Sequence, residues 1–256
     1  MTQDLGRLGS REIQKLQMFD FASATPLMYF DYANTTTFET NSSRVYAWGA
    51  GSRRIAWDGE KELSLSVETQ LFTLEHLAII AGEEIVEGAR DIYRVDTLVV
   101  GADNKIELDK TPIGGVSGVA VFPYVNGVID KKQAQSVQSI TSKTITLASG
   151  STVTVGQEVQ VFYQWKSTKS KTVSFTAKGF PKYVKLVGDT LFVDELAGEA
   201  EASQIVYYKA KVQPNISIAM SSQGDPSSIT LTFDLFPVSV KGVETLVDIS
   251  VYDDEE

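Results

Sequence analysis

The chain has 256 residues, with 23 Lys and Arg against 33 Asp and Glu, one His and no Cys, and its formal charge is −10. Without cysteine there is no disulfide framework, zinc–thiolate site, iron–sulfur cluster or cysteine nucleophile, and a lone His76 excludes a multi-histidine metal site. The acidic surplus argues against a general nucleic-acid-binding protein, because phosphate neutralisation needs clustered positive charge.

The sequence shows neither a signal peptide nor a run of roughly 20 apolar residues that would cross a membrane. We therefore expect a soluble protein made in a cytoplasm, with no membrane partner and no cofactor.

Residues 1–19 are the first predicted feature. Ile13, Leu16 and Phe19 lie at helical spacing, which predicts a helix over residues 10–19. An extended arm that orders only against a neighbouring chain is the alternative. We favour the arm, because the first nine residues offer almost nothing to bury.

An alternation of apolar and polar residues dominates the chain and predicts short antiparallel strands. Residues 61–68 place Leu63, Leu65 and Val67 on one face, and the same period recurs in residues 153–155, 158–163, 172–176 and 229–235. Turn residues separate such runs at Asp58-Gly59, Asn126-Gly127, Ser149-Gly150 and Gly188-Asp189. The predicted fold class is all-β, an antiparallel sandwich or barrel with one short flanking helix.

That helix is predicted between Thr73, a suitable N-cap, and Gly82, a suitable stop, with Leu74, Leu77, Ile79 and Ile80 as its apolar face. His76 lies in the first turn, off this face, so we expect its side chain to be partly exposed. Catalysis by His76 would need a serine and an acid converging in space, and no Gly-x-Ser-x-Gly elbow exists.

Residues 111–167 are rich in Gly, Val, Ser and Gln and poor in acid. They predict either an inserted β-subdomain or a long hairpin within a single domain of residues 1–256. The core of that domain is then discontinuous, covering residues 20–110 and 168–252.

Carboxylates crowd together at Asp58, Glu60 and Glu62, and again at Glu83, Glu84 and Glu87. Glycoside hydrolysis needs two carboxylates facing each other across a cleft, and neighbours on one hairpin or loop do not supply that geometry. We interpret both groups as solvated surface and expect no catalytic residue, no bound metal and no enzyme activity.

Six lysines and no acidic residue lie between Trp165 and Leu186, with Phe175, Phe180 and Tyr183 among them. This basic contact strip has three interpretations: a surface for nucleic acid or an acidic partner, an edge strand protected by charge, or a surface that meets an acidic face of a second copy. Its lysines are Lys166, Lys169, Lys171, Lys178, Lys182 and Lys185.

Residues 44–82 combine a strand, a small-residue turn at Gly49-Ala-Gly-Ser52, a second strand, the Asp58-Gly59 hairpin, an alternating strand and the short helix. This succession resembles the core of bacteriophage tail tube proteins. The segments from Phe180-Pro-Lys-Tyr-Val184 to Leu231-Thr-Phe-Asp-Leu-Phe-Pro237 also look like such virion proteins. The resemblance is one of pattern and covers under half of the chain.

The resemblance implies a subunit that forms rings, usually hexameric, in which the sheets of adjacent copies join into an inner barrel. Stacked rings would form a tail tube that encloses the tape-measure protein and later guides the genome during ejection. The resemblance also implies baseplate or sheath proteins as further partners. It implies that the protein is located in the virion tail after assembly in the host cytoplasm. An acidic lumen would repel DNA phosphates and let the duplex slide.

Carried onto this sequence, residues 33–43 would be a polar loop reaching between stacked rings, with Thr35, Thr36 and Phe38 at the contact, or else a mobile surface hairpin. Arg53 and Arg54 beside Trp57 would anchor a subunit interface, or else form an exposed arginine pair beside a core tryptophan. Glu60 and Glu62 would carry lumen-facing charge, and residues 253–256 would be a solvated tail.

Two alternatives stay open. The protein could be another phage structural β-protein, such as a baseplate, tail-terminator or capsid-decorating protein. It could also be a carbohydrate-binding β-sandwich in which Trp48, Trp57 and Trp165 stack on sugar rings.

Overall fold

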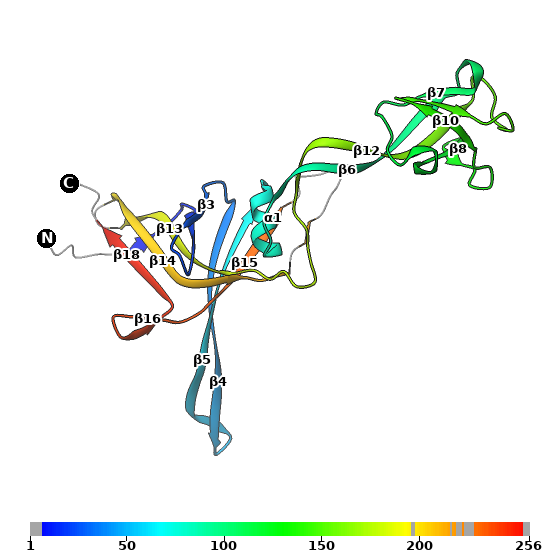
Figure 1. Ribbon diagram of the computed structural model, residues 1–256. Coiled ribbons are helices and arrows are strands. Elements are labelled where there is room, and N and C mark those ends of the chain that lie inside the picture. Colours follow the sequence, from blue (N-terminus) through cyan, green and yellow to red (C-terminus); the bar gives the residue numbers. More distant parts are fainter. Residues whose placement is uncertain (1–6, 196–197, 216, 219–221, 223–227, 253–256) are drawn as a thin grey trace. The chain divides into compact units, whose positions relative to one another are not determined.

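The computed structural model describes residues 7–195, 198–215, 217–218, 222 and 228–252, and it confirms the all-β class (Figure 1). The predicted acidic tail at 253–256 lies outside the described residues. The chain divides into two units: unit 1 comprises Met1–Ile85 and Val173–Glu256, and unit 2 comprises Val86–Thr172. Each is described by itself.

Unit 1 is built on a nine-stranded antiparallel sheet with the order β3-β2-β13-β14-β15-β5-β4, in which β1 also pairs with β13 and β18 with β14. Two further short strands, β16 and β17, pair with each other. The bounds are β1 Leu8–Gly9, β2 Lys15–Asp20, β3 Pro26–Phe30, β4 Thr35–Gly49, β5 Ser52–Thr69, β13 Tyr183–Asp194, β14 Ala200–Val212, β15 Ile229–Leu235, β16 Val238–Val240, β17 Val243–Thr245 and β18 Val247–Tyr252.

One face of this sheet forms the core of unit 1. Leu65 of β5 lies directly opposite Phe233 of β15, and both are buried with Leu186 of β13. The other face is polar at the same strands, where the hydroxyls of Ser66 and Thr232 lie 3.2 Å apart. The period-two pattern of residues 61–68 and 229–235 therefore produces the half-buried strands that it predicts.

The predicted helix is confirmed as α1, Leu74–Ala81, with Thr73 at the N-cap. Gly82 ends it in the left-handed conformation at φ 66°, and a Cβ at this position would lie 2.1 Å from the carbonyl oxygen of Phe180. Glycine is therefore required here for both backbone conformation and space.

The prediction of a partly exposed His76 is wrong, because the side chain is only 2% exposed. Its Nδ1 accepts a hydrogen bond from the backbone N–H of Thr73 at 3.0 Å, and its Nε2 lies 3.1 Å from the hydroxyl of Tyr32. The ring also packs edge-on against Phe30. His76 is buried because it satisfies an otherwise unpaired N–H at the start of the helix.

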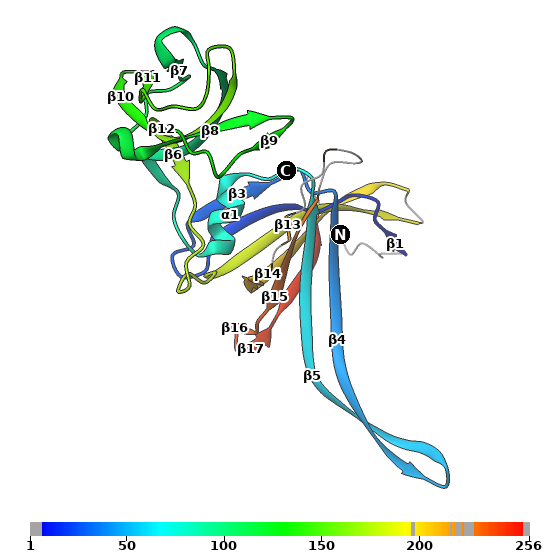
Figure 2. The same ribbon diagram turned by 90° about the vertical axis from the view of Figure 1, so that its right-hand side faces the viewer.

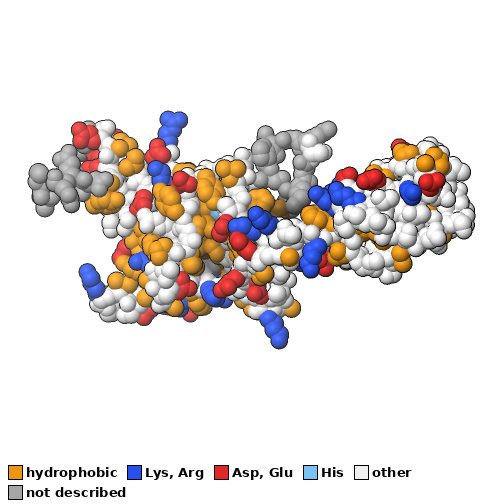
Figure 3. Space-filling model, turned by 45° about the horizontal axis from the view of Figure 1, so that its top comes forward, with side chains coloured by type: hydrophobic (Ala, Val, Ile, Leu, Met, Phe, Trp, Pro, Cys, Tyr) orange, Lys and Arg blue, Asp and Glu red, His pale blue; other side chains and the backbone are white. Residues whose placement is uncertain are grey.

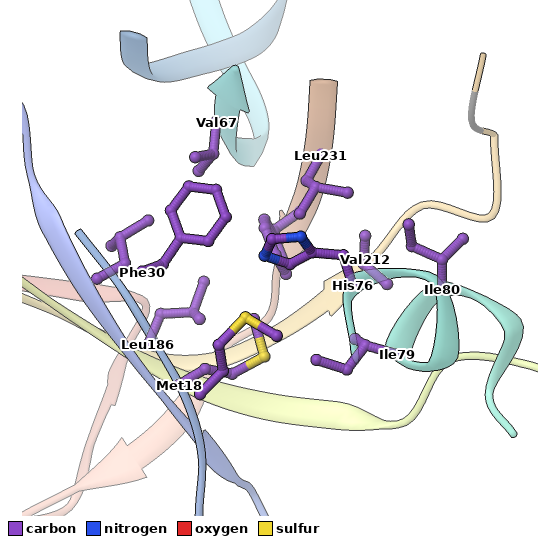
Figure 4. A pocket seen from close by; sticks show the side chains of 12 residues that line it. Met18, Phe30, Val67, His76, Ile79, Ile80, Leu186, Val212 and Leu231 are labelled. Carbon is purple, nitrogen blue, oxygen red and sulfur yellow. The ribbon is translucent and has the colours of Figure 1, made fainter. Parts of the chain in front are cut away.

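His76 borders a small apolar cavity of about 20 Å³, which is roughly the space of one water molecule (Figure 4). Met18, Phe30, Ile79 and Leu186 are among its lining side chains. The cavity is a packing gap between α1 and the sheet, too small for an organic ligand.

We expect the free energy of unfolding of unit 1 to fall as the pH is lowered from about 7 to about 5. Burial lowers the pKa of His76 from 6.5, against an opposing effect of Glu75. The neutral ring is favoured in the fold, so its stabilisation is present above pH 6.5 and is lost as the pH falls toward the lowered pKa. Urea unfolding at several pH values measures this slope.

The control is His76→Gln, which removes the only imidazole of the chain. This variant should unfold with a flatter pH profile above about pH 5, where most carboxylates stay ionised. An identical slope in both proteins would contradict the role of His76.

Neither the helix nor the arm expected near the N-terminus forms over residues 15–20. This segment is β2, which pairs with β3 and β13 inside the nine-stranded sheet. Leu16 and Met18 alternate into the core, and this alternation, rather than the helical spacing of Ile13 and Leu16, describes the segment.

Unit 2 contains a four-stranded sheet with the order β6-β12-β8-β9 and a three-stranded sheet with the order β10-β11-β7. Val121 and Val161 of the first sheet and Ile106 and Ile145 of the second belong to one buried cluster. The bounds are β6 Val86–Val99, β7 Lys105–Glu107, β8 Val119–Val125, β9 Val128–Ile129, β10 Val137–Thr141, β11 Thr144–Leu147 and β12 Glu158–Thr172, with 3₁₀ turns at Ala102–Asn104 and Gly115–Gly118. The boundaries expected at 111 and 167 lie inside this unit, because β6 and β12 pair from end to end.

Asp96 is the buried charge of unit 2. Its carboxylate accepts hydrogen bonds from the Tyr163 hydroxyl at 2.6 Å, from Arg94 Nε at 2.6 Å and from the backbone N–H of Asp109 at 3.2 Å. Burial raises the pKa of Asp96, but these bonds outweigh it and hold the pKa below its usual value. The network ties β6, β12 and the segment after β7 together.

Two of the four predicted turns form, at Asn126-Gly127 and Ser149-Gly150. The turns predicted at Asp58-Gly59 and Gly188-Asp189 are wrong, since both pairs lie inside strands. A Cβ on Gly59 would lie 2.1 Å from Ser43 Oγ, and one on Gly188 would lie 2.6 Å from Gln14 Oε1. These glycines allow close approach of neighbouring segments instead of chain reversal.

Candidate assembly surface

The longest hairpin of unit 1 extends beyond its own sheet. β15 pairs with β5 only over residues 63–69, whereas β4 pairs with β5 as far as Gly49 and Ser52. Residues 43–60, which we call the hairpin arm, project away from the rest of unit 1 (Figures 1 and 2). Ala50 and Gly51, with φ values of 51° and 77°, make the tight turn at its tip, as predicted for the small-residue segment.

One face of the hairpin arm is apolar and uncovered by the described residues. Val45 lies directly opposite Trp57, and Ala47 lies opposite Ile55, so the four side chains share a face. Val45 is 67% exposed, Ile55 55% and Trp57 54%. A contiguous apolar surface of this kind marks an interaction site, because it leaves hydrophobic area in water without any gain inside the subunit.

The opposite face of the hairpin arm carries arginine side chains that contact aromatic and acidic residues of the same arm. The Arg53 guanidinium lies 4.2 Å from the centre of the Tyr46 ring and 5.4 Å from that of Trp48. Arg44 Nε lies 2.5 Å from Asp58 Oδ1. These contacts hold the arginines against the hairpin and contribute to its stiffness away from the sheet.

Arg54, expected as an anchor with Arg53, donates a hydrogen bond from Nε to the carbonyl of Gly49 at 3.2 Å. A register shift between Ala47 and Trp48 lets Arg53 and Arg54 lie side by side opposite Trp48. Trp57 lies on the exposed apolar face, so it is not the core tryptophan of the alternative interpretation. The interface role of the three residues stays a prediction.

Residues 35–43 are not the polar loop that the sequence predicted, because they form the first part of β4. Thr36 Oγ1 accepts a hydrogen bond from the Gln14 N–H at 3.3 Å, and the Phe38 ring lies 6.0 Å from that of Tyr207. Both residues share the core-facing side of β4, while Thr35 lies on its other face. Threonine favours the pleated strand as strongly as it favours loops, which explains the error.

Glu60 and Glu62 are exposed in β5, at the point where the hairpin leaves the sheet. Glu62 lies opposite Asn41 of β4. The two carboxylates share a face of one strand, as their spacing requires. Their predicted position in a lumen stays a prediction.

The basic contact strip is divided between the two units. Lys166, Lys169 and Lys171 belong to β12 of unit 2, whereas Lys178, Lys182 and Lys185 belong to unit 1. Lys171 forms an ion pair with Glu87 at 2.7 Å. On the face drawn in Figure 3, acidic and basic side chains are interspersed, with no large field of one sign.

The three tryptophans of the sugar-binding alternative are divided between the two units. Trp48 and Trp57 lie on opposite faces of the hairpin arm, and Trp165 packs against the core of unit 2 beneath Lys110. Trp48 and Trp57 therefore share no stacking surface.

Sequence reasoning did not single out Val45 and Ile55, which are exposed on the hairpin arm. Large apolar residues are most often buried, so residue type alone does not indicate their exposure. The register across the Ala50-Gly51 turn could have indicated their position. It places Val45 opposite Trp57 on one face of a hairpin, and among the described residues no further strand pairs with this part of the hairpin.

The part of the chain that the structure describes contains no helix long and apolar enough to cross a membrane. A family model described as the YomU/Tube protein family matches residues 10–246. No curated protein matches the chain.

Proposed function

We propose that this chain, which belongs to the YomU/Tube protein family, is a virion structural subunit that assembles with copies of itself into stacked rings. The stacked rings form a phage tail tube, which encloses the tape-measure protein and later conducts the genome. The role is structural and needs no catalysis or cofactor.

One observation carries the proposal: the exposed apolar face of the hairpin arm. Val45, Ile55 and Trp57 are each more than half exposed, although their side chains are large and apolar. Burying this face against another copy removes the area from water and supplies the main gain of association. Aromatic side chains, here Trp57, concentrate binding energy at such contacts.

The two ends of the nine-stranded sheet support a ring over a symmetric dimer. β4 ends the strand order on one side and β3 ends it on the other, so each copy offers two different edges. Pairing β4 of one copy with β3 of the next is a head-to-tail contact, which closes into a ring when the rotation permits. We expect six copies in the ring, from the resemblance to tail tube proteins.

The negative charge of unit 1 favours a lumen through which DNA passes without being bound. Unit 2 contains ten Lys and Arg and eight Asp and Glu, a formal charge of +2, which leaves −12 for unit 1. A lumen formed by unit 1, with Glu60 and Glu62 on its wall, repels phosphates and lets the duplex slide.

Baseplate or sheath proteins are further partners of the assembled tube.

Negative-stain electron microscopy of the purified full chain, with sedimentation velocity over a range of concentrations, tests the proposal. We expect rings or tubes that become more abundant as concentration rises. A chain that stays monomeric at the highest concentration, with no ring or tube on the grid, contradicts it.

A further inference from the structure

Lysine side chains gather around Tyr183 on the outward face of the nine-stranded sheet. The Lys209 ammonium lies 4.4 Å from the centre of the Tyr183 ring, and the Lys211 ammonium lies 5.2 Å from it. Lys185 follows Tyr183 by two residues in β13, and Val184 between them belongs to the core. Both residues therefore point away from the core. We call Lys185, Lys209, Lys211 and Tyr183 the lysine cluster.

Aromatic rings hold the central lysine of this cluster in place. The Lys209 ammonium lies 5.3 Å from the centre of the Phe21 ring and 6.0 Å from that of Phe236. The rings of Phe236 and Tyr183 meet edge to face, with 5.4 Å between their centres and 90° between their planes. Contact with a ring face attracts an ammonium group but leaves its charge in place. Lys209 is therefore positioned and still able to pair with an anion.

No ion pair neutralises the lysine cluster within the part of the chain that the structure describes. Asp234 lies directly opposite Lys211, but its carboxylate accepts a hydrogen bond from the Gln213 amide at 2.7 Å. Asp248 of β18 accepts one from the Tyr208 hydroxyl at 2.6 Å. The cluster thus concentrates three positive charges in unit 1, whose formal charge is −12.

Four consecutive acidic residues, Asp253-Asp-Glu-Glu256, follow β18 in the sequence. β18 runs antiparallel to β14 with Tyr252 opposite Ala202, so the chain leaves β18 in the direction away from Lys209. Lys209 lies seven residues beyond Ala202, which is about 23 Å along the strand. Four residues span at most about 14 Å, and a reversal of direction would use most of them. Residues 253–256 are therefore too few to reach the lysine cluster of their own copy.

We propose that residues 253–256 of one copy bind the lysine cluster of another copy. Carboxylates accept charge-assisted hydrogen bonds from ammonium groups. Lys209 and Lys211 are separated by about 6.8 Å along β14, and Lys185 lies on the adjacent strand about 4.8 Å away. An extended tetrapeptide spans about 10 Å, so its carboxylates cover a cluster of this size. The inference rests on the proposed self-association, because it requires two copies to meet.

Duplex DNA is the alternative polyanion, and the surroundings of the lysine cluster disfavour it. A duplex carries one charge per about 1.7 Å of its axis, so a bound duplex extends well beyond a cluster of about 10 Å. It would then run over the rest of unit 1, which is strongly acidic and repels phosphates. A tetrapeptide keeps its carboxylates beside the lysines, since its length equals that of the cluster.

Fluorescence anisotropy with a labelled peptide of residues 251–256 tests the proposal. The receptor is the full-length chain with a neutral tail, so that its own carboxylates do not compete; its substitutions are Asp253→Asn, Asp254→Asn, Glu255→Gln and Glu256→Gln. We expect saturable binding that weakens as ionic strength rises, because salt screens exposed charges. Lys209→Gln combined with Lys211→Gln should lower the affinity about tenfold, since two charge-assisted contacts are removed.

Lys131→Gln combined with Lys132→Gln is the matched control, because it removes two charges from an exposed lysine pair of unit 2 and should leave binding unchanged. Circular dichroism checks that both double variants keep the unfolding midpoint of the receptor. The proposal is overturned by equal binding of a peptide that ends in Asn-Asn-Gln-Gln, or by equal losses in the two double variants. Tighter binding of a 20-base-pair duplex that depends on Lys209 and Lys211 would make DNA the occupant instead.

The test separates this inference from the proposed function. Rings or tubes on the grid without peptide binding would overturn the tail contact and leave the proposed tube. Peptide binding by a chain that forms no ring or tube would support the tail contact and contradict the tube.

Discussion

We expect Ile55→Asp combined with Trp57→Asp to abolish the proposed ring assembly and to leave a folded monomer. Both side chains lie on the exposed apolar face of the hairpin arm, so their replacement removes no contact with the core of unit 1. In an assembled interface, two carboxylates would be buried without partners, and each such burial costs several kcal/mol. Sedimentation velocity and negative-stain microscopy measure the loss of assembly.

A second hairpin of the same chain provides the matched control. Val125 and Val128 are directly opposite each other beside the Asn126-Gly127 turn in unit 2, and they are as exposed as Ile55 and Trp57. Val125→Asp combined with Val128→Asp adds the same charge to an equally exposed pair and should assemble normally. Normal assembly of the arm variant, or equal loss of assembly in both variants, would remove the hairpin arm from the interface.

Asp96→Ala lowers the free energy of unfolding of unit 2 by about 3 kcal/mol. The substitution removes the acceptor for the Tyr163 hydroxyl, Arg94 Nε and the Asp109 N–H at once. The Tyr163 side chain is buried, so its O–H would be left without an acceptor, while its oxygen keeps the hydrogen bond from the Lys110 N–H at 3.2 Å. Urea unfolding monitored by circular dichroism measures the loss.

Asp109→Ala is the control for this network. Asp109 also forms an ion pair with Arg94, but its side chain is 60% exposed, so water screens the pair. Its removal should cost less than about 1 kcal/mol, since exposed ion pairs contribute little. Equal losses in the two variants would mean that burial of Asp96 does not decide the stability of unit 2.

Much of the fold follows from local signals in the sequence. α1 was predictable because Thr73, the apolar side chains and Gly82 all specify the same helix. β5 and β15 were predictable over residues 63–69 and 229–235 because one face is buried there, and burial on one face produces strict alternation. The turn at Ala50-Gly51 followed from its small residues, of which Gly51 readily adopts positive φ.

Other features depend on contacts between distant residues, which no local pattern specifies. Gly59 reads as a turn residue, yet it lies in β5 because Ser43 of the neighbouring strand approaches it closely. His76 reads as a surface residue, yet it is buried because Tyr32, 44 residues earlier in the chain, supplies a partner for its second nitrogen.

The candidate surfaces show the same limit. Val45 and Trp57 become one surface only through the register of β4 and β5. The sequence predicted individual residues such as Arg53 and Trp57 at an interface. The faces to which these residues belong could be identified only from the pairing of the strands.

The pairing of β6 and β12 also concerns how the chain is put together. Val86 and Thr172, the first and last residues of unit 2, are cross-strand partners, so the points where the chain enters and leaves are only about 5 Å apart. A segment attached through two adjacent ends can be exchanged without stretching the chain on either side of it. We therefore expect that unit 2 can be replaced by another domain with adjacent termini, joined at residues 85 and 173.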